Sequence, residues 1–324
     1  MAPGPSKYST WPTTGRKARP STISQRPPPF YRLPLELVHH IFNIAAASSR
    51  RSCLDICLVA SWAHGIARPH LFRAIVIEDA ITFNNFMESV VNPLYKPAVT
   101  NTHLTGQSLV NGVWCQGYWS QPSSLFRVFN VCDNVTHLAM DGSAFGYLFR
   151  RLSRLFGSIS NDIKGQDLHL VIMGYYVYIN PSRKTPIFDR ITHICITDVS
   201  SYGTAIHGLD QFSRLSHVSL PYCLRSQHDT RDLYDFLELQ SLKMLVIALD
   251  VDIVRKGHWK KLGRWVRKAR ETDGRVYLVE CGGMSVFREE WNNEVRGGES
   301  IWDRAVRYTD EWERAVEPSG MQSQ

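Results

Sequence analysis

The sequence predicts an α/β fold in which an all-α N-terminal module precedes an irregular solenoid of strand and helix repeats. Apolar residues recur at helical spacing between residues 34 and 63. Four similar strand-like strings follow at related intervals, and helical patterns separate them. With 44% hydrophobic residues in a chain of 324, a substantial core can be buried.

The positive charge of the chain is concentrated at its front. Residues 1–35 carry six of the 37 Lys and Arg residues and none of the 30 Asp and Glu residues, which leaves 31 basic against 30 acidic residues beyond them. Because the body is nearly neutral, bulk charge gives no reason to expect a nucleic-acid partner. Residues 1–31 are also rich in Pro, Ser and Thr, and we expect them to form a disordered basic tail.

The cysteine pattern and the absence of a long apolar segment predict the compartment. The seven cysteines include no CxxC pair, and the first residues lack the apolar region of a secretory signal. We therefore expect a reducing location, cytoplasmic or nuclear, and no membrane partner.

The N-terminal module is predicted to be helical from Pro34. Proline suits a first helical turn, Glu36 favours the positive helix end, and apolar residues then recur at intervals of three and four. Ser52 can cap a second helix whose polar surface is small, and Gly65 and Pro69 are expected to end it. A short strand-like run, 71–78, follows. Residues 74–130 then read as a connecting segment, with a helix around 80–91 and an aperiodic, uncharged loop over 99–124.

The strand-like strings indicate a repeat array over residues 131–316. VTHLAM, ITHICI, LSHVSL and LKMLVI begin at residues 135, 191, 215 and 242, so that successive starts differ by 56, 24 and 27 residues. DLHLVIM at 167–173 can divide the first interval, and the shorter spacings lie within the range of leucine-rich repeats. Helical patterns at 147–156, 206–215 and 230–239 alternate with these strings. VYLVEC at 276–281 is expected to be the last strand, helices near 285–295 and 301–316 to cap the open end of the array, and 317–324 to be a tail.

Residues 32–73 resemble the F-box. LPLELVHHIF and CLVASWAHGIARPHLFRAI contain the LPxEL start, the Ile-Phe pair, the Leu-Val-x-x-Trp helix and the final Pro-x-Leu-Phe-Arg of that family. With the degenerate repeats, the chain resembles fungal F-box proteins with a leucine-rich-repeat-like C-terminal region. The resemblance implies a non-enzymatic substrate receptor of a Skp-cullin-F-box ubiquitin ligase, without a cofactor, that acts in ubiquitin-dependent degradation.

The resemblance also assigns residues to adaptor binding. A helical unit of about forty residues cannot complete its own core, so a Skp-type adaptor, which links it to a cullin, would cover its apolar face. The positions carried over are Leu33, Pro34, Leu37, Ile41, Phe42, Leu58, Val59 and Trp62. Two alternatives stay open: the segment is only the N-terminal cap of the repeat array, or the protein is an interaction scaffold without a ligase.

Three histidines are candidate target-facing residues. His137, His193 and His217 occupy the third position of their strings, which faces outward in a leucine-rich repeat. Because adjacent strands lie about 4.8 Å apart, His193 and His217 can approach closely enough to share a metal ion. No recurring Asp or Cys completes a ligand set, so structural histidines are favoured and no metal is expected.

The remaining candidates have simple structural interpretations. The basic segment 255–270 can bind an acidic partner, RNA or lipid, but its apolar stripe also fits an ordinary packed helix. Cys53 and Cys57 are one helical turn apart in an apolar setting that favours core residues, and the adjacent His39 and His40 diverge. The sequence contains no common catalytic motif; an enzyme would require a polar pocket with convergent His and Asp groups.

Overall fold

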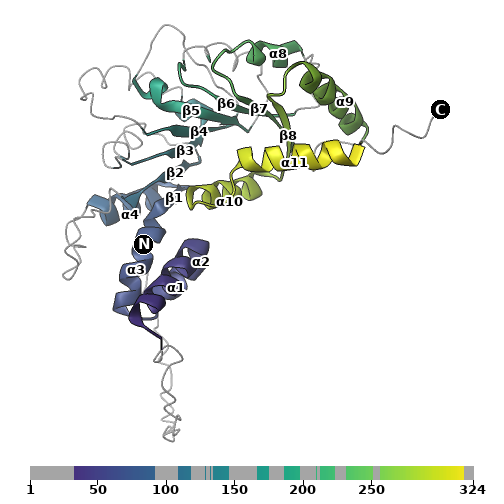
Figure 1. The fold of residues 1–324 in the computed structure, drawn as a ribbon. Helices are drawn as coiled ribbons and strands as arrows, with labels where there is room; N and C mark the ends of the chain where they lie inside the picture. Colours follow the sequence, from purple (N-terminus) through teal and green to yellow (C-terminus); the bar gives the residue numbers. More distant parts are fainter. Residues whose placement is uncertain are drawn as a thin grey trace, which may run out of the picture.

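The protein is built around one sheet of eight parallel strands in chain order (Figure 1). The computed structural model describes residues 33–91, 109–117, 128, 132, 134–145, 166–174, 186–197, 209, 212–222, 231–250 and 256–316. The predicted tails, 1–31 and 317–324, and the predicted helix at 147–156 lie outside these residues, as does half of the one at 206–215.

The eight strands are short and apolar. They are β1 (Ala74–Ile77), β2 (Gly112–Cys115), β3 (His137–Asp141), β4 (Leu168–Met173), β5 (Ile191–Ile196), β6 (His217–Pro221), β7 (Met244–Asp250) and β8 (Val276–Cys281). All four residues of β2 and the first six of β7 are buried. Such continuous apolar runs are typical of parallel sheets with both faces covered.

Helices cover both faces of this sheet, as Figure 1 shows for α8 and α9 on one side and α10 and α11 on the other. The first face packs against α4 (Ala80–Val91), the 3-10 helix η4 (Pro186–Arg190), α8 (Arg231–Leu237) and α9 (Lys256–Thr272). The second face packs against α10 (Met284–Val295) and α11 (Ile301–Val316). Alternation along each strand divides the residues between the two cores: Val113 and Cys115 belong to the first, and Trp114 to the second.

The predicted architecture, a three-helix F-box followed by an irregular leucine-rich-repeat-like solenoid, is wrong. The described strands form a single all-parallel sheet in an α/β fold. Helices α10 and α11, expected to cap the end of an array, instead lay Phe287, Trp291 and Trp302 across one sheet face. A solenoid would have left that face as an open, extended surface. Periodicity in the sequence indicated the strands but could not show that later helices fold back over them.

Part of the uncharged stretch at 99–124, which was predicted to be a loop, is a strand. Residues 109–117 include strand β2, which lies between β1 and β3. Its four residues are too few to show a period, and their burial depends on partners far away in the chain. Among the described helices, none has the length and apolar character that a bilayer crossing requires.

Three N-terminal helices form a separate small cluster. They are α1 (Leu35–Ser48), α2 (Arg50–Cys57) and α3 (Ser61–Arg73), and α3 leads directly into β1. Ser49, not Ser52, caps α2 by accepting a hydrogen bond from the Ser52 backbone N–H. The second predicted helix is in fact two, and α3 continues through Gly65 and Pro69, which were expected to end it. The core of the cluster consists of Val38, Phe42, Ala46, Cys53, Ile56, Ala63 and Ala67.

Helix α11 covers the edge of the sheet at β8. The Thr309 hydroxyl is fully buried, accepts a hydrogen bond of 2.8 Å from the Leu278 backbone N–H, and donates to the Ala305 carbonyl at 2.7 Å. An edge strand has unpaired backbone groups, and this side chain satisfies one of them.

Replacing Thr309 with Val is expected to lower the free energy of unfolding by about 1–2 kcal/mol, because the Leu278 N–H would stay buried without an acceptor. Urea unfolding measures the change. Thr309→Ser keeps the hydroxyl and should lose much less. Equal losses for Val and Ser would show that the methyl group, and not the hydrogen bond, is what matters.

Candidate functional site

Large apolar side chains gather on the outside of α1, α2 and α3. Of the thirteen exposed large hydrophobic residues in the described ranges, nine lie between residues 33 and 62. We call these nine the N-terminal apolar surface: Leu33, Leu35, Leu37, Ile41, Ile44, Leu54, Leu58, Val59 and Trp62. Concentrated exposure of this kind marks an interaction surface more often than a free monomer surface.

Helix α1 explains how this surface arises. Val38, Phe42 and Ala46 are spaced by four residues and are buried in the helical cluster. Leu37 and Ile41 follow the same spacing one residue earlier and stay exposed, at 49% and 44%. The helix therefore has two adjacent apolar stripes, and its own chain covers only one of them.

The structure separates the predicted adaptor-binding residues into two groups. Seven are exposed: Leu33, Pro34, Leu37, Ile41, Leu58, Val59 and Trp62. Phe42 points inward, is 8% exposed, and lies 5.1 Å from the Trp62 ring, so it supports the surface from behind. Sequence reasoning missed Leu35, Ile44 and Leu54. Ile44, seven residues after Leu37, continues the exposed stripe and could have been found from helical spacing.

Trp62 is held in place while its ring remains 44% exposed. The His39 ring stacks on it at 5.7 Å with an interplanar angle of 17°, and Phe42 packs against it at a steeper angle. An exposed but oriented indole is suited to act as an anchor in an interface, since little conformational entropy is lost on binding.

A row of four closely spaced histidine rings crosses strands β3 to β6. The sheet register aligns His137, His169, His193 and His217 on neighbouring strands. Their ring centroids are 4.5, 3.9 and 4.1 Å apart in that order. The sequence identified three of them but overlooked His169, whose string DLHLVIM also places histidine in the third position.

Hydroxyl groups orient three of these rings. Thr136, Thr192 and Ser216 each precede a histidine and lie 2.8 to 2.9 Å from its Nδ1 atom. Leu168 precedes His169, so that ring has no such neighbour. Its Nδ1 atom instead lies 3.2 Å from a carboxylate oxygen of Glu294.

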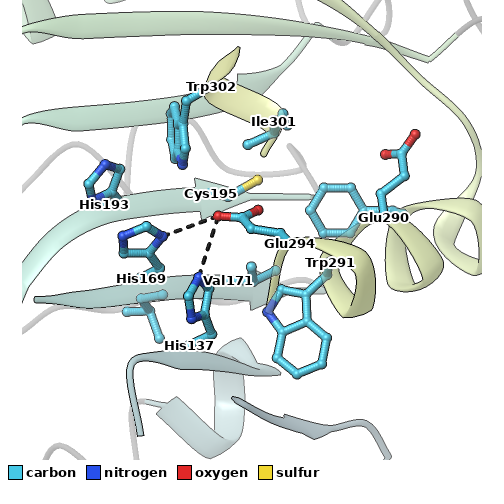
Figure 2. A pocket seen from close by; sticks show the side chains of 12 residues that line it. His137, His169, Val171, His193, Cys195, Glu290, Trp291, Glu294, Ile301 and Trp302 are labelled. Atoms are coloured by element: carbon cyan, nitrogen blue, oxygen red, sulfur yellow. Dashed lines mark hydrogen bonds and ion pairs between the residues drawn. The ribbon is translucent and has the colours of Figure 1, made fainter. Parts of the chain in front are cut away.

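Glu294, on α10, reaches two of the histidines, as Figure 2 shows. Its Oε1 atom is 3.2 Å from His169 Nδ1 and 3.6 Å from His137 Nε2. Burial by itself raises the pKa of this carboxyl, but hydrogen bonding to His137 and His169 outweighs burial and lowers the pKa to about 2. Glu294 is therefore an anion at neutral pH.

The predicted target-facing histidines lie on the sheet face that α10 and α11 cover. The Trp302 ring, on α11, is 5.2 Å from His193 and 5.3 Å from His217. Burial, together with the neighbouring imidazoles, lowers the pKa of His193 to about 2, so this ring stays neutral. All three rings keep some exposure, and contact with a target stays a prediction for them.

The ring orientations of His193 and His217 do not suit binding of a shared metal ion. Their rings lie face to face with an interplanar angle of 16°. Within the described residues, the group with three closely spaced ligand atoms consists of His137, His169 and Glu294, whose ligand atoms lie within 4.8 Å of one another.

The other sequence candidates have mostly structural roles in the described residues. Cys53 donates from Sγ to the Ala67 carbonyl, and burial raises its pKa to about 11, which makes it an inert thiol of the helical core. On α9, Leu262, Val266 and Ala269 pack into the first sheet face, while Arg264 and Arg267 are exposed. The apolar stripe of the basic segment is therefore part of the core, and binding by its basic face stays a prediction.

Comparison with known proteins gives no relative from which function can be transferred. A scan against protein-family models finds no match to the chain, and a search of curated proteins finds none either. Function must therefore be inferred from the residues themselves, namely the N-terminal apolar surface and the cluster of His137, His169 and Glu294.

Proposed function

We propose that this protein is the substrate-recognition subunit of a Skp-cullin-F-box type ubiquitin ligase. Helices α1 to α3 would dock on a Skp-type adaptor through the N-terminal apolar surface, and the part of the chain beyond α3 would hold a target protein. The observation that supports this most directly is the concentration of nine exposed large apolar residues on these helices and the residues next to them.

The small core of the helical cluster supports the proposal. Three of its seven buried residues are alanines, and only Val38, Phe42 and Ile56 contribute large aliphatic or aromatic side chains. Removing apolar area from water contributes roughly 25 cal/mol per Å². A core of this size therefore gains little stability from burial. A partner that covers Leu37, Ile41 and Trp62 would add the missing apolar contacts.

The motif residues also fall where an adaptor could reach them. In the LPxEL start, Leu33 and Pro34 lie exposed directly before α1 and Leu37 lies exposed on it, while Leu58 and Val59 lie exposed in the turn between α2 and α3. Leu58 is the most exposed of the nine, at 87%. An apolar side chain this open in a turn contributes little to packing among the residues that the structure describes.

In such a complex the protein would perform no chemistry. It would hold a target lysine near ubiquitin that other subunits carry, so that transfer proceeds at a high effective concentration. Helix α3 continues into β1 without an intervening loop, and this direct connection would restrict the position of the target-binding part relative to the adaptor.

The test is binding of the full chain to a purified Skp-type adaptor. Leu37→Ala combined with Ile41→Ala should weaken the complex at least 100-fold, because truncated interface anchors typically cost about 2 kcal/mol or more each. Isothermal titration calorimetry measures the dissociation constant, and circular dichroism verifies that the helices remain folded.

Ile81→Ala is the matched control, since Ile81 is an apolar residue on α4, outside the surface, and is even more exposed, at 71%. It should bind like the unmodified chain. The proposal fails if the unmodified chain does not bind the adaptor, or if the double variant, still folded, binds as tightly as the Ile81→Ala control.

A further inference from the structure

We propose that His137, His169 and Glu294 form a binding site for one divalent transition-metal ion, with Zn²⁺ the best match to the donors. The site is independent of the N-terminal apolar surface. Two imidazoles and one carboxylate form a donor set typical of zinc sites that keep a fourth position for water.

The separations between the ligand atoms fit a single metal ion. Glu294 Oε1 lies 3.2 Å from His169 Nδ1 and 3.6 Å from His137 Nε2. Ligands at about 2.0–2.1 Å from a tetrahedral zinc ion are separated from each other by about 3.4 Å. The two Glu294 distances lie on either side of this value, and all three ligand atoms lie within 4.8 Å of one another, so an ion can be accommodated after side-chain adjustments.

The Thr136 hydroxyl positions the His137 ring. It lies 2.9 Å from Nδ1, and the ring presents Nε2 to Glu294 Oε1, 3.6 Å away. A metal ion between Nε2 and the carboxylate would use the Nε2 lone pair while Nδ1–H donates to the hydroxyl, which is the usual arrangement of a metal-bound histidine.

The surroundings leave room for a fourth ligand. A cavity of about 20 Å³ lies beside the three residues and is also lined by Trp291 and Trp302. This volume accommodates about one water molecule. The buried Trp291 Nε1–H, on the cavity wall, has no hydrogen-bond partner among the described residues, so a metal-bound water is one acceptor that it could find.

The ligands come from elements distant in the chain, so the ion would also stabilise the fold. His137 and His169 lie opposite each other on β3 and β4, and Glu294 lies on α10, 125 residues after His169. A metal ion bound here would tie α10 to the second sheet face. Because an unfolded chain would not preserve this geometry, binding should raise the thermal unfolding temperature.

The experiment uses the full chain, first stripped with a chelator and then titrated with Co²⁺ and Zn²⁺. We expect one ion per chain, the intense visible absorption of tetrahedral Co²⁺, and displacement of cobalt by zinc. X-ray absorption at the zinc edge should show two imidazole ligands. Glu294→Gln, which has nearly the same shape, should weaken Co²⁺ binding at least tenfold.

His217→Asn is the matched control, because His217 belongs to the same row of histidines but is not one of the three grouped ligand residues. It should bind Co²⁺ as the unmodified chain does. The proposal is overturned if the unmodified chain takes up no stoichiometric metal. It is also overturned if His217→Asn loses as much affinity as Glu294→Gln. Should either variant misfold, the zinc-edge ligand count on the unmodified chain decides.

Discussion

Replacing Trp114 with Ala is expected to lower the free energy of unfolding by about 3–5 kcal/mol. Trp114 is completely buried in β2, on the sheet face that α10 and α11 cover. Its ring lies 5.3 Å from that of Trp291 and 6.2 Å from that of Phe287, both on α10. Truncation would leave a large cavity between sheet and helix that these rigid neighbours cannot fill.

Two control variants make this prediction specific. Trp114→Phe keeps an aromatic ring but loses the hydrogen bond of 3.2 Å from the indole N–H to Gln116, so it should cost clearly less than Ala. Trp62→Ala removes the same side chain from an exposed site on α3 and should change stability much less. Urea unfolding of all three variants gives the comparison. A loss for Trp114→Ala no greater than that for Trp62→Ala would show that α10 is not anchored through this ring.

The sequence predicted the individual strands well, and the reason is local. The strings at 135–140, 191–196, 215–220, 242–247 and 276–281 all contain described strands. Each string is a run of apolar and β-branched residues between polar turns, and a strand needs little more to be recognised. The histidines also align across neighbouring strands because each occupies the third position of its string.

The covering of the sheet could not be predicted in the same way. Phe287, Trp291 and Val295 recur every four residues and so reveal that α10 has an apolar face. The local sequence does not show whether that apolar face packs against the end of the sheet or lies across one of its faces. The second sheet face was therefore expected to be open, and the predicted solenoid was wrong.

The candidate metal site was missed because it combines residues from three elements. His169 has the same phase as the other histidines and could have been found in the sequence. Glu294 follows Trp291 by three residues, so it borders the apolar stripe of α10 and points towards the sheet. Its position opposite His137 and His169 depends on the packing of α10 on β3 and β4, which helical spacing cannot specify.

Helix α1 shows the same limit on a smaller scale. Both of its stripes are apolar, so the sequence placed Phe42 among the adaptor-binding residues although its neighbours α2 and α3 bury it. Composition cannot decide which of two similar stripes the chain covers. Only the packing of the three helices assigns Leu37 and Ile41 to the outside.

The contact between β2 and α10 leads to a second large effect, at Gly112. A Cβ atom at this position would lie 2.7 Å from both methyl carbons of Val295 and 3.1 Å from Trp291 Cη2. Gly112→Ala should therefore lower the free energy of unfolding by about 2–3 kcal/mol, because a branched side chain and an indole on a packed helix cannot move aside easily. Gly274→Ala, at a position with open space around it, should change stability by only about 0.5 kcal/mol or less.

A double-mutant cycle with Val295→Ala tests whether the cause is this steric clash. Removing the two methyl groups creates room for the new Cβ, so the double variant should be more stable than the sum of the single losses predicts, by about 1–2 kcal/mol. Urea unfolding of the four proteins gives the coupling energy. Strict additivity would mean that Gly112→Ala acts on the β2 backbone alone. The close approach of α10 to this strand, on which the position of Glu294 depends, would then not be the reason for glycine at this position.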